Sequence, residues 1–273
     1  MSHAHAPRGG VLVVLSLVAA VLAIATSLTG ILVPATYARE TAAWALQAVG
    51  QDIANLPVAV VLLWSAVLVR RGSPGALLVW LGCLLYFIYV FAIYAFSVHL
   101  NRLFLAYVAV LGLSFHAMAG TLLGLDREAV TRPLRDHPHG NAAGILLIAI
   151  GILFGGLWLS ALLPHAFAGT PPPDLAETGL WTNPVHVLDL AFVLPAMILV
   201  GVRLRRQDAW ALLLAVPLLV FSVTMGLGIL ILFAMSVAHG LPVAAPAVIV
   251  VAVVVILSAV YARLLMRGPF RAG

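Results

Sequence analysis

The sequence contains no lysine and a single cysteine, and only 8% of its 273 residues are charged. The absence of lysine excludes a retinal-type Schiff base, which needs a lysine amine. The lone Cys83 excludes an intrachain disulfide and a cysteine-based zinc or iron–sulfur site, because such sites need several thiolates. Soluble domains carry roughly a quarter charged residues. This chain therefore lacks the polar cover that a water-soluble fold requires.

Apolar residues make up 64% of the chain. About 20 consecutive apolar residues cross the hydrocarbon layer as a helix, which satisfies its own backbone hydrogen bonds. The sequence therefore predicts an all-α fold: a polytopic transmembrane helical bundle of eight spans that forms one domain over residues 1–273. The predicted spans are 11–33, 48–69, 75–98, 103–125, 142–163, 185–202, 209–237 and 244–265.

Arginine supplies all 14 basic residues, and its distribution predicts the orientation. With the N-terminus in the cytoplasm, only Arg39 and Arg102 lie outside. The positive-inside rule therefore predicts a multi-pass protein of the cytoplasmic membrane with both termini in the cytoplasm. The arginines form short runs between apolar segments, so we expect contact with membrane lipid and no nucleic-acid binding. A cleavable signal ending near Ala38 is the alternative for the first span, but its apolar run is longer than a usual signal core.

The sequence has two polar connectors: a cytoplasmic one over 126–141, which separates two parts of the chain that resemble each other, and an outer loop over 164–184 within the second part. Segments 10–125 and 140–266 share several residues at matched positions. The pairs are Gly10 and Gly140, Pro34 and Pro164, Asp52 and Asp189, and Arg70-Arg71 and Arg205-Arg206. This pattern predicts a parallel 4+4 internal repeat around an axis along the membrane normal. Chance similarity between apolar sequences is the alternative.

Polar side chains inside the spans are costly in lipid, so they mark candidate sites. We expect an outward-facing ligand or ion pocket lined by Asp52, Asn55, His99, Arg102, His186 and Asp189. The spacing of His186 and Asp189 places both on one helix face. The structural alternative is that the two aspartates pair with Arg102 or Arg39, or cap their helices.

Further candidates are histidines and tyrosines. His116 lies deeper in the fourth span and is a candidate buried relay for protons, or a neutral imidazole bonded to a nearby carbonyl. The candidate ligands for a metal or haem are His99, His186 and His239, although no cofactor is predicted. Tyr86 and Tyr89 need hydrogen-bond partners, which a cavity or a neighbouring helix can supply.

The sequence lacks a Walker A loop, an HExxH motif and a Gly-x-Ser-x-Gly motif, so a non-enzymatic role is favoured. Our leading hypothesis is a small-solute or ion permease in which Asp52 and Asp189 carry charge or protons. One alternative is a noncatalytic membrane assembly partner or sensor that acts as a homo-oligomer or with a membrane partner protein. The other is a membrane-bound haem or metal redox protein.

Three stretches resemble a family of uncharacterised bacterial multi-pass membrane proteins. They are Gln51-Asp52-Ile-Ala-Asn55-Leu, Arg70-Arg71-Gly72-Ser73 and Asn101-Arg102-Leu-Phe-Leu-Ala-Tyr107-Val. The resemblance extends to Val187-Leu-Asp189-Leu and so covers most of the chain. It implies a membrane location and carries no activity.

Overall fold

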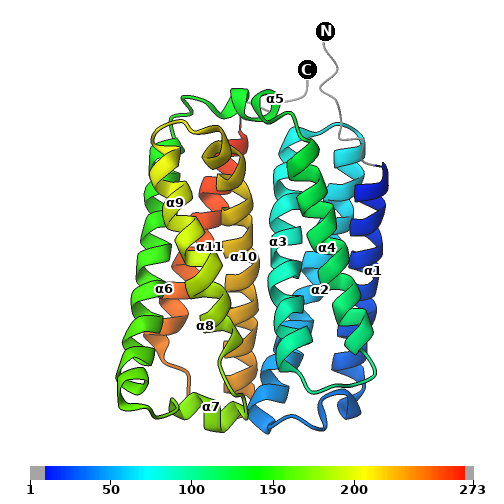
Figure 1. The fold of residues 1–273 in the computed structure, drawn as a ribbon, viewed down its shortest axis with the longest axis vertical. Coiled ribbons are helices and arrows are strands. Elements are labelled where there is room, and N and C mark those ends of the chain that lie inside the picture. Colours follow the sequence, from blue (N-terminus) through cyan, green and yellow to red (C-terminus); the bar gives the residue numbers. More distant parts are fainter. Residues whose placement is uncertain (1–9, 268–273) are drawn as a thin grey trace.

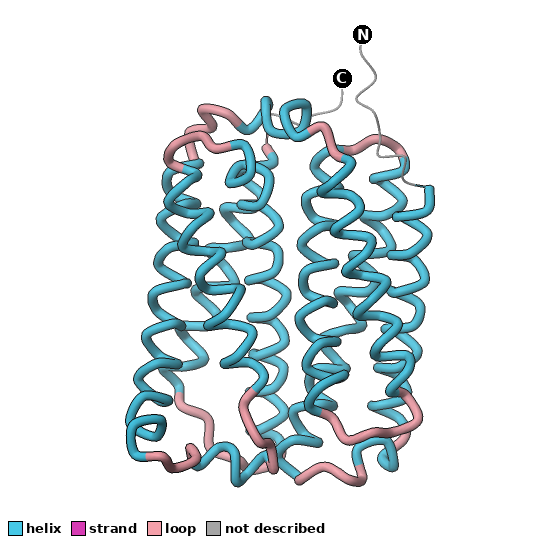
Figure 2. Tube along the Cα trace, in the orientation of Figure 1, coloured by secondary structure: helices cyan, strands magenta, loops and turns pink. Residues whose placement is uncertain are grey.

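The computed structural model describes residues 10–267, and this part of the chain contains helices and no strand. Eight of its helical segments are long and apolar enough to cross a membrane. They stand side by side as a bundle (Figure 1), and most of the connecting loops lie at its two ends (Figure 2). The prediction of an all-helical bundle with eight spans is therefore confirmed.

The spans agree closely with the predicted ranges. They are α1 (Gly10–Leu32), α2 (Ala42–Arg70), α3 (Pro74–Ser97), α4 (Phe104–Gly124), α6 (Gly140–Ala168), the composite Pro184–Leu204, α10 (Ala209–Ala238) and α11 (Ala245–Met266). The composite span consists of α8 (Pro184–Leu188), a π-helical turn η3 (Asp189–Val193) and α9 (Leu194–Leu204). The connectors contain η1 (Pro34–Tyr37), α5 (Arg127–Thr131), η2 (Arg132–Leu134) and α7 (Pro173–Thr178).

Side-chain caps begin α3 and α10 at the end of the bundle that carries α5. The Ser73 hydroxyl accepts a hydrogen bond from the backbone N–H of Ala76 at the start of α3. The Asp208 carboxylate accepts from the backbone N–H groups of Trp210 and Ala211 at the start of α10. These caps satisfy N–H groups that have no partner within the helix, so short turns can join α2 to α3 and α9 to α10.

The spans form two groups of four. One group contains α1 to α4, and the other contains α6, the composite span, α10 and α11 (Figure 1). The groups meet where α10 packs against α2 and α3. In the first group α1 contacts α4 along much of its length, whereas α6 makes far fewer contacts with α11 in the second. The predicted 4+4 repeat stays a prediction, and the looser contact between α6 and α11 leaves room for a cavity.

Large apolar side chains cover the outside of the bundle. Val60 and Trp64 of α2, Ile152 of α6 and Ile256 of α11 each expose about 60% of their surface. Soluble proteins rarely expose contiguous apolar patches beyond a few hundred Å². This outer surface therefore contacts lipid, which agrees with a multi-pass membrane protein.

The two ends of the bundle can be distinguished by labelling. The start of α1 and the end of α11 lie at the same end as α5 (Figure 1), and the arginine distribution predicts that this end is cytoplasmic. In a Cys83→Ala background, we expect a membrane-impermeant maleimide to label Ala176→Cys, in α7, on intact cells. Arg71→Cys, in the turn after α2, should react only after lysis. The reverse pattern would show that the predicted orientation is wrong.

Candidate functional site

Asp52 is buried inside the first group of helices, with 1% of its surface exposed. Its Oδ2 accepts a hydrogen bond from the Tyr37 hydroxyl (2.7 Å), and its Oδ1 accepts from the Tyr94 hydroxyl (2.9 Å). Because α2 begins at Ala42 rather than near residue 48, Asp52 lies about 15 Å along the helix. The interpretation that an arginine pairs with Asp52 is wrong, since two tyrosines from η1 and α3 satisfy the carboxylate.

The surroundings of Asp52 keep Tyr37 protonated and need a glycine on α1. Tyr37 lies in η1, outside the spans, and burial together with the nearby Asp52 carboxylate raises the pKa of its hydroxyl well above the ordinary value. The hydroxyl therefore keeps its proton and donates. A Cβ atom at Gly30 would collide with the Asp52 carboxylate, so only glycine lets α1 approach this closely.

Asn55 belongs to a hydrogen-bond network next to Asp52. Its Nδ2 donates to the Ser27 hydroxyl (3.1 Å), and its Oδ1 accepts from the Tyr86 hydroxyl (2.9 Å). Gln51 Nε2 donates to the same Tyr86 oxygen at 2.6 Å. Buried polar groups are stabilising only when they are satisfied, and here α1, α2 and α3 supply partners to one another. The expectation that Tyr86 needs such partners is confirmed.

Asp189 forms a second cluster, in the other group of helices. Its Oδ1 accepts a hydrogen bond from the Tyr89 hydroxyl of α3 (3.0 Å), and its Oδ2 accepts from the Trp158 indole Nε1 of α6 (2.8 Å). Asp189 is the first residue of η3, whose π-type hydrogen bond joins the Leu194 N–H to the Asp189 carbonyl. Pro195 follows directly and has no N–H to continue an α-helical ladder. Single π-turns within helices occur frequently at functional sites.

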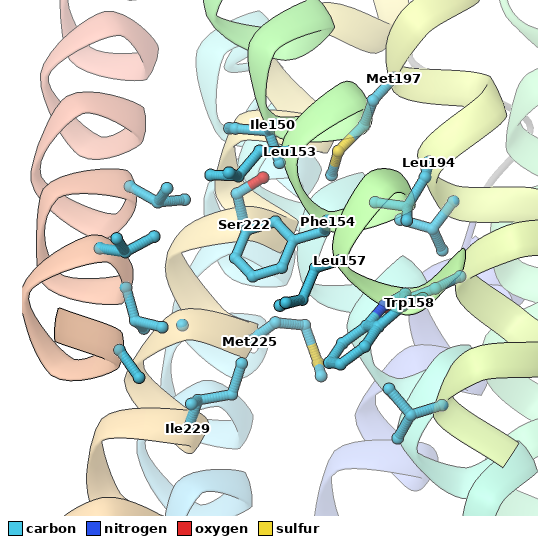
Figure 3. Close-up of a pocket in the computed structure, with 18 of the residues that line it drawn as sticks. Ile150, Leu153, Phe154, Leu157, Trp158, Leu194, Met197, Ser222, Met225 and Ile229 are labelled. Atoms are coloured by element: carbon cyan, nitrogen blue, oxygen red, sulfur yellow. The ribbon is translucent and has the colours of Figure 1, made fainter. Parts of the chain in front are cut away.

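A cavity of about 510 Å³ adjoins Asp189. It lies between α6, α9, α10 and α11, and Tyr89 contributes to its wall. Figure 3 shows α6 residues Phe154 and Leu157 and α10 residue Met225 extending into the space between these helices. The expectation that Tyr89 needs a hydrogen-bond partner is confirmed, since its hydroxyl donates to Asp189 and both residues line this cavity.

The cavity wall is almost wholly apolar and follows helical periodicity. On α6 it is formed by Ile150, Leu153, Phe154, Leu157 and Trp158, and on α11 by Pro246, Ala247, Val250, Val251 and Val254. Both sets recur at intervals of three or four residues, with adjacent pairs, and so occupy one face of each helix. On α11 the set spans only the first half of the helix. The cavity therefore lies in the half of the membrane next to α8.

His186 lies one turn before Asp189 but faces elsewhere. It is buried, its ring centroid lies 4.6 Å from that of Trp158, and its Nδ1 has no hydrogen-bond partner. It lines a second hollow of about 640 Å³ near the end of the bundle that carries α7, together with His165 and Asp174. The Trp158 ring thus contacts His186 while its indole nitrogen donates to Asp189.

The other predicted residues lie at the surface. His99 follows α3, and its Nδ1 is 2.9 Å from the Glu40 carboxylate. Arg102 and His239 are exposed, and His239 caps the end of α10. His116 is not buried as predicted, because it lies on the exposed side of α4; its Nδ1 approaches the Gly112 carbonyl at 2.7 Å. The interpretation of His116 as an imidazole bonded to a nearby carbonyl is right about the partner. It is wrong about burial, because the ring lies at the lipid surface.

The structure distributes the predicted pocket residues over three places. Asp52 and Asn55 share one cluster, His186 and Asp189 lie on the composite span, and His99 and Arg102 lie near the loop after α3. Within residues 10–267 no group of three or more histidine, cysteine or acidic side chains could hold a metal ion. Accordingly His99, His186 and His239 belong to separate helix ends and form no common ligand set.

Three residues that donate hydrogen bonds to the two aspartates, Tyr37, Tyr94 and Trp158, were not predicted as their partners. Tyr37 lies in a connector, where helical periodicity gives no signal. Trp158 carries a hydrogen-bond donor that must find a partner in an apolar span, which was the one available indication.

Comparisons with family models, with curated proteins and with solved structures found no match to this chain.

Proposed function

We propose that this protein binds a small, mostly apolar molecule that is dissolved in the membrane. The supporting observation is the cavity of about 510 Å³ between α6, α9, α10 and α11. Small-molecule sites are typically about 300–1,000 Å³, are mostly apolar, and contain a few fixed polar groups. Here the wall is aliphatic and aromatic, and the Asp189 carboxylate is the fixed polar group.

The ligand enters sideways from the lipid. Leu153 and Leu157 of α6 and Val250 of α11 line the cavity, yet each also exposes between 39% and 51% of its surface on the outside of the bundle. Residues that do both lie at an opening, here between α6 and α11. These two helices make few contacts with each other, so the opening does not need a large rearrangement.

Transport of a small solute or ion, the leading hypothesis from the sequence, stays a prediction. A hydrophilic solute needs a polar lining, whereas the cavity beside Asp189 is apolar and Asp52 is enclosed by its own hydrogen-bond partners. A membrane-dissolved ligand fits both facts, because it is stabilised by the apolar wall and needs only one polar contact.

A pair of substitutions on α11 tests the proposed function. Ala247 lines the cavity, whereas Ile249 faces lipid. In lipid nanodiscs, 1-bromooctane should quench the fluorescence of Trp158. The contribution of Trp158 is the fluorescence of the native protein minus that of the Trp158→Phe variant. We expect Ala247→Phe to fill part of the cavity. The concentration of 1-bromooctane in the lipid that gives half-maximal quenching should then rise about tenfold or more, since apolar burial contributes about 0.8 kcal/mol per CH₂.

Ile249→Phe adds a similar ring to the same helix outside the cavity and should leave the quenching unchanged. Equal quenching in the native protein and in Ala247→Phe, with both proteins folded, would show that the cavity is not the binding site.

A further inference from the structure

We infer that the molecule bound in the cavity is a lipophilic ammonium compound, with its apolar part against α10 and α11 and its protonated amine at Asp189. This inference rests on the proposed function, and it adds the chemical class of the ligand. Three features of the described residues support it: the arrangement of the carboxylate, the lack of a cation beside it, and the aromatic rings around it.

The carboxylate is arranged as an acceptor. The indole N–H of Trp158 can only donate, so Asp189 Oδ2 must accept from it, and Tyr89 donates to Oδ1. An ionised carboxylate offers about four lone-pair sites, of which these two bonds occupy two. Asp189 is partly exposed and lines the cavity. A ligand group that meets it there is therefore bound best when it donates hydrogen bonds.

Among the described residues, no cationic side chain contacts this carboxylate. Among residues 10–267, no arginine or histidine nitrogen lies within 4.0 Å of either Asp189 oxygen. The chain has no lysine, and His186 directs its ring onto Trp158. Asp189 is the one charged residue among the described residues that line the cavity. A negative group in the membrane interior is costly without a partner of opposite charge, and a ligand cation is such a partner.

Aromatic rings surround the same end of the cavity. Tyr89, Phe154, Trp158 and Phe221 line it, with the rings of Tyr89 and Phe221 5.4 Å apart and those of Phe154 and Trp158 6.3 Å apart. The faces of aromatic rings attract ammonium groups, and the attraction grows when water is excluded. A carboxylate beside aromatic rings in an apolar cavity thus favours an amine over an alcohol of the same length.

The test compares octylammonium with 1-octanol, which differ only in the polar end. Each is added to displace 1-bromooctane from the native protein in nanodiscs of zwitterionic lipid, with Trp158 quenching as the readout. We expect octylammonium to displace the bromoalkane at a concentration in the lipid about tenfold or more lower than 1-octanol does. Asp189→Asn keeps the shape and one acceptor oxygen but removes the charge, and should abolish this preference while 1-octanol still binds.

Glu177→Gln is the matched control, because it removes one negative charge from the nearby exposed helix α7 without touching the cavity. It should keep the full preference for octylammonium. Equal displacement by the two compounds in the native protein, or an unchanged preference in Asp189→Asn, would overturn the inference and leave the proposed function intact. Failure of all three octyl compounds to bind the native protein would overturn the proposed function itself.

Discussion

Replacing Gly201 with leucine is expected to separate α6 from α9 and to abolish ligand binding. A Cβ atom at Gly201 would lie 2.5 Å from the backbone oxygen of Gly144 and 2.7 Å from the Ile148 side chain. The Gly144 oxygen cannot move without shifting α6, so the helices must part. Overpacking of this kind costs about 1–3 kcal/mol, and a leucine placed against a backbone is at the upper end.

The effect on binding follows from where the cavity residues lie. Trp158 is on α6 and Asp189 is on the composite span, so parting these helices breaks the 2.8 Å bond between them. Stability can be followed with a thiol-reactive dye during heating in detergent, because Cys83 is the chain's only cysteine and is completely buried. We expect Cys83 of Gly201→Leu to react at a clearly lower temperature than in the native protein.

Gly156→Leu is the matched control for this prediction. Gly156 also lies on α6, but a Cβ there meets nothing within 4 Å. Leucine also favours the helix over glycine, so this variant should unfold at the native temperature or above it. Equal behaviour of the two variants would show that the close approach of α6 and α9 does not stabilise the bundle.

The fold could be predicted because lipid imposes a simple rule on the sequence. An apolar run of sufficient length must form a helix, and the eight runs appear at nearly the predicted positions. The start of α2 was predicted six residues late, because the polar Gln47 was placed outside the apolar run. Gln51 and Asp52 are accommodated because tyrosines from other elements bond to them. Hydropathy cannot report partners that are distant in the sequence.

The sites were less predictable for the same reason. Tyr37 lies 15 residues before Asp52, and Tyr94 lies 42 residues after it, so no local spacing links them. His116 illustrates a second difficulty: its position along α4 was predicted, but the face that it occupies depends on which side of α4 packs against α1 and α3. The cavity depends on the spacing of α6 and α11, and a single sequence contains no measure of that distance.

Asp52→Ala is expected to destabilise the first group of helices by about 2–6 kcal/mol. The substitution leaves the hydroxyls of Tyr37 and Tyr94 without their acceptor in a buried site, and each unsatisfied group costs about 1–3 kcal/mol. Asp52→Asn should be milder, because its amide can still accept one of the two hydrogen bonds. The temperature at which Cys83 becomes reactive should therefore fall in the order native, Asp52→Asn, Asp52→Ala.

Gly30 provides an independent check that this loss arises at the carboxylate. In the native background Gly30→Ala places a Cβ atom where the Asp52 carboxylate lies and should lower the unfolding temperature strongly. In the Asp52→Ala background the carboxylate is gone, and the Tyr37 hydroxyl, which would lie 2.8 Å from the new Cβ, no longer has an acceptor there to hold it, so Gly30→Ala should cost much less. Contacting residues show such non-additivity, whereas independent sites do not. If the two substitutions lowered the unfolding temperature by strictly additive amounts, Asp52 would not be packed against α1. The hydrogen-bonded cluster around Asp52 would then not be the feature that joins α1, α2 and α3.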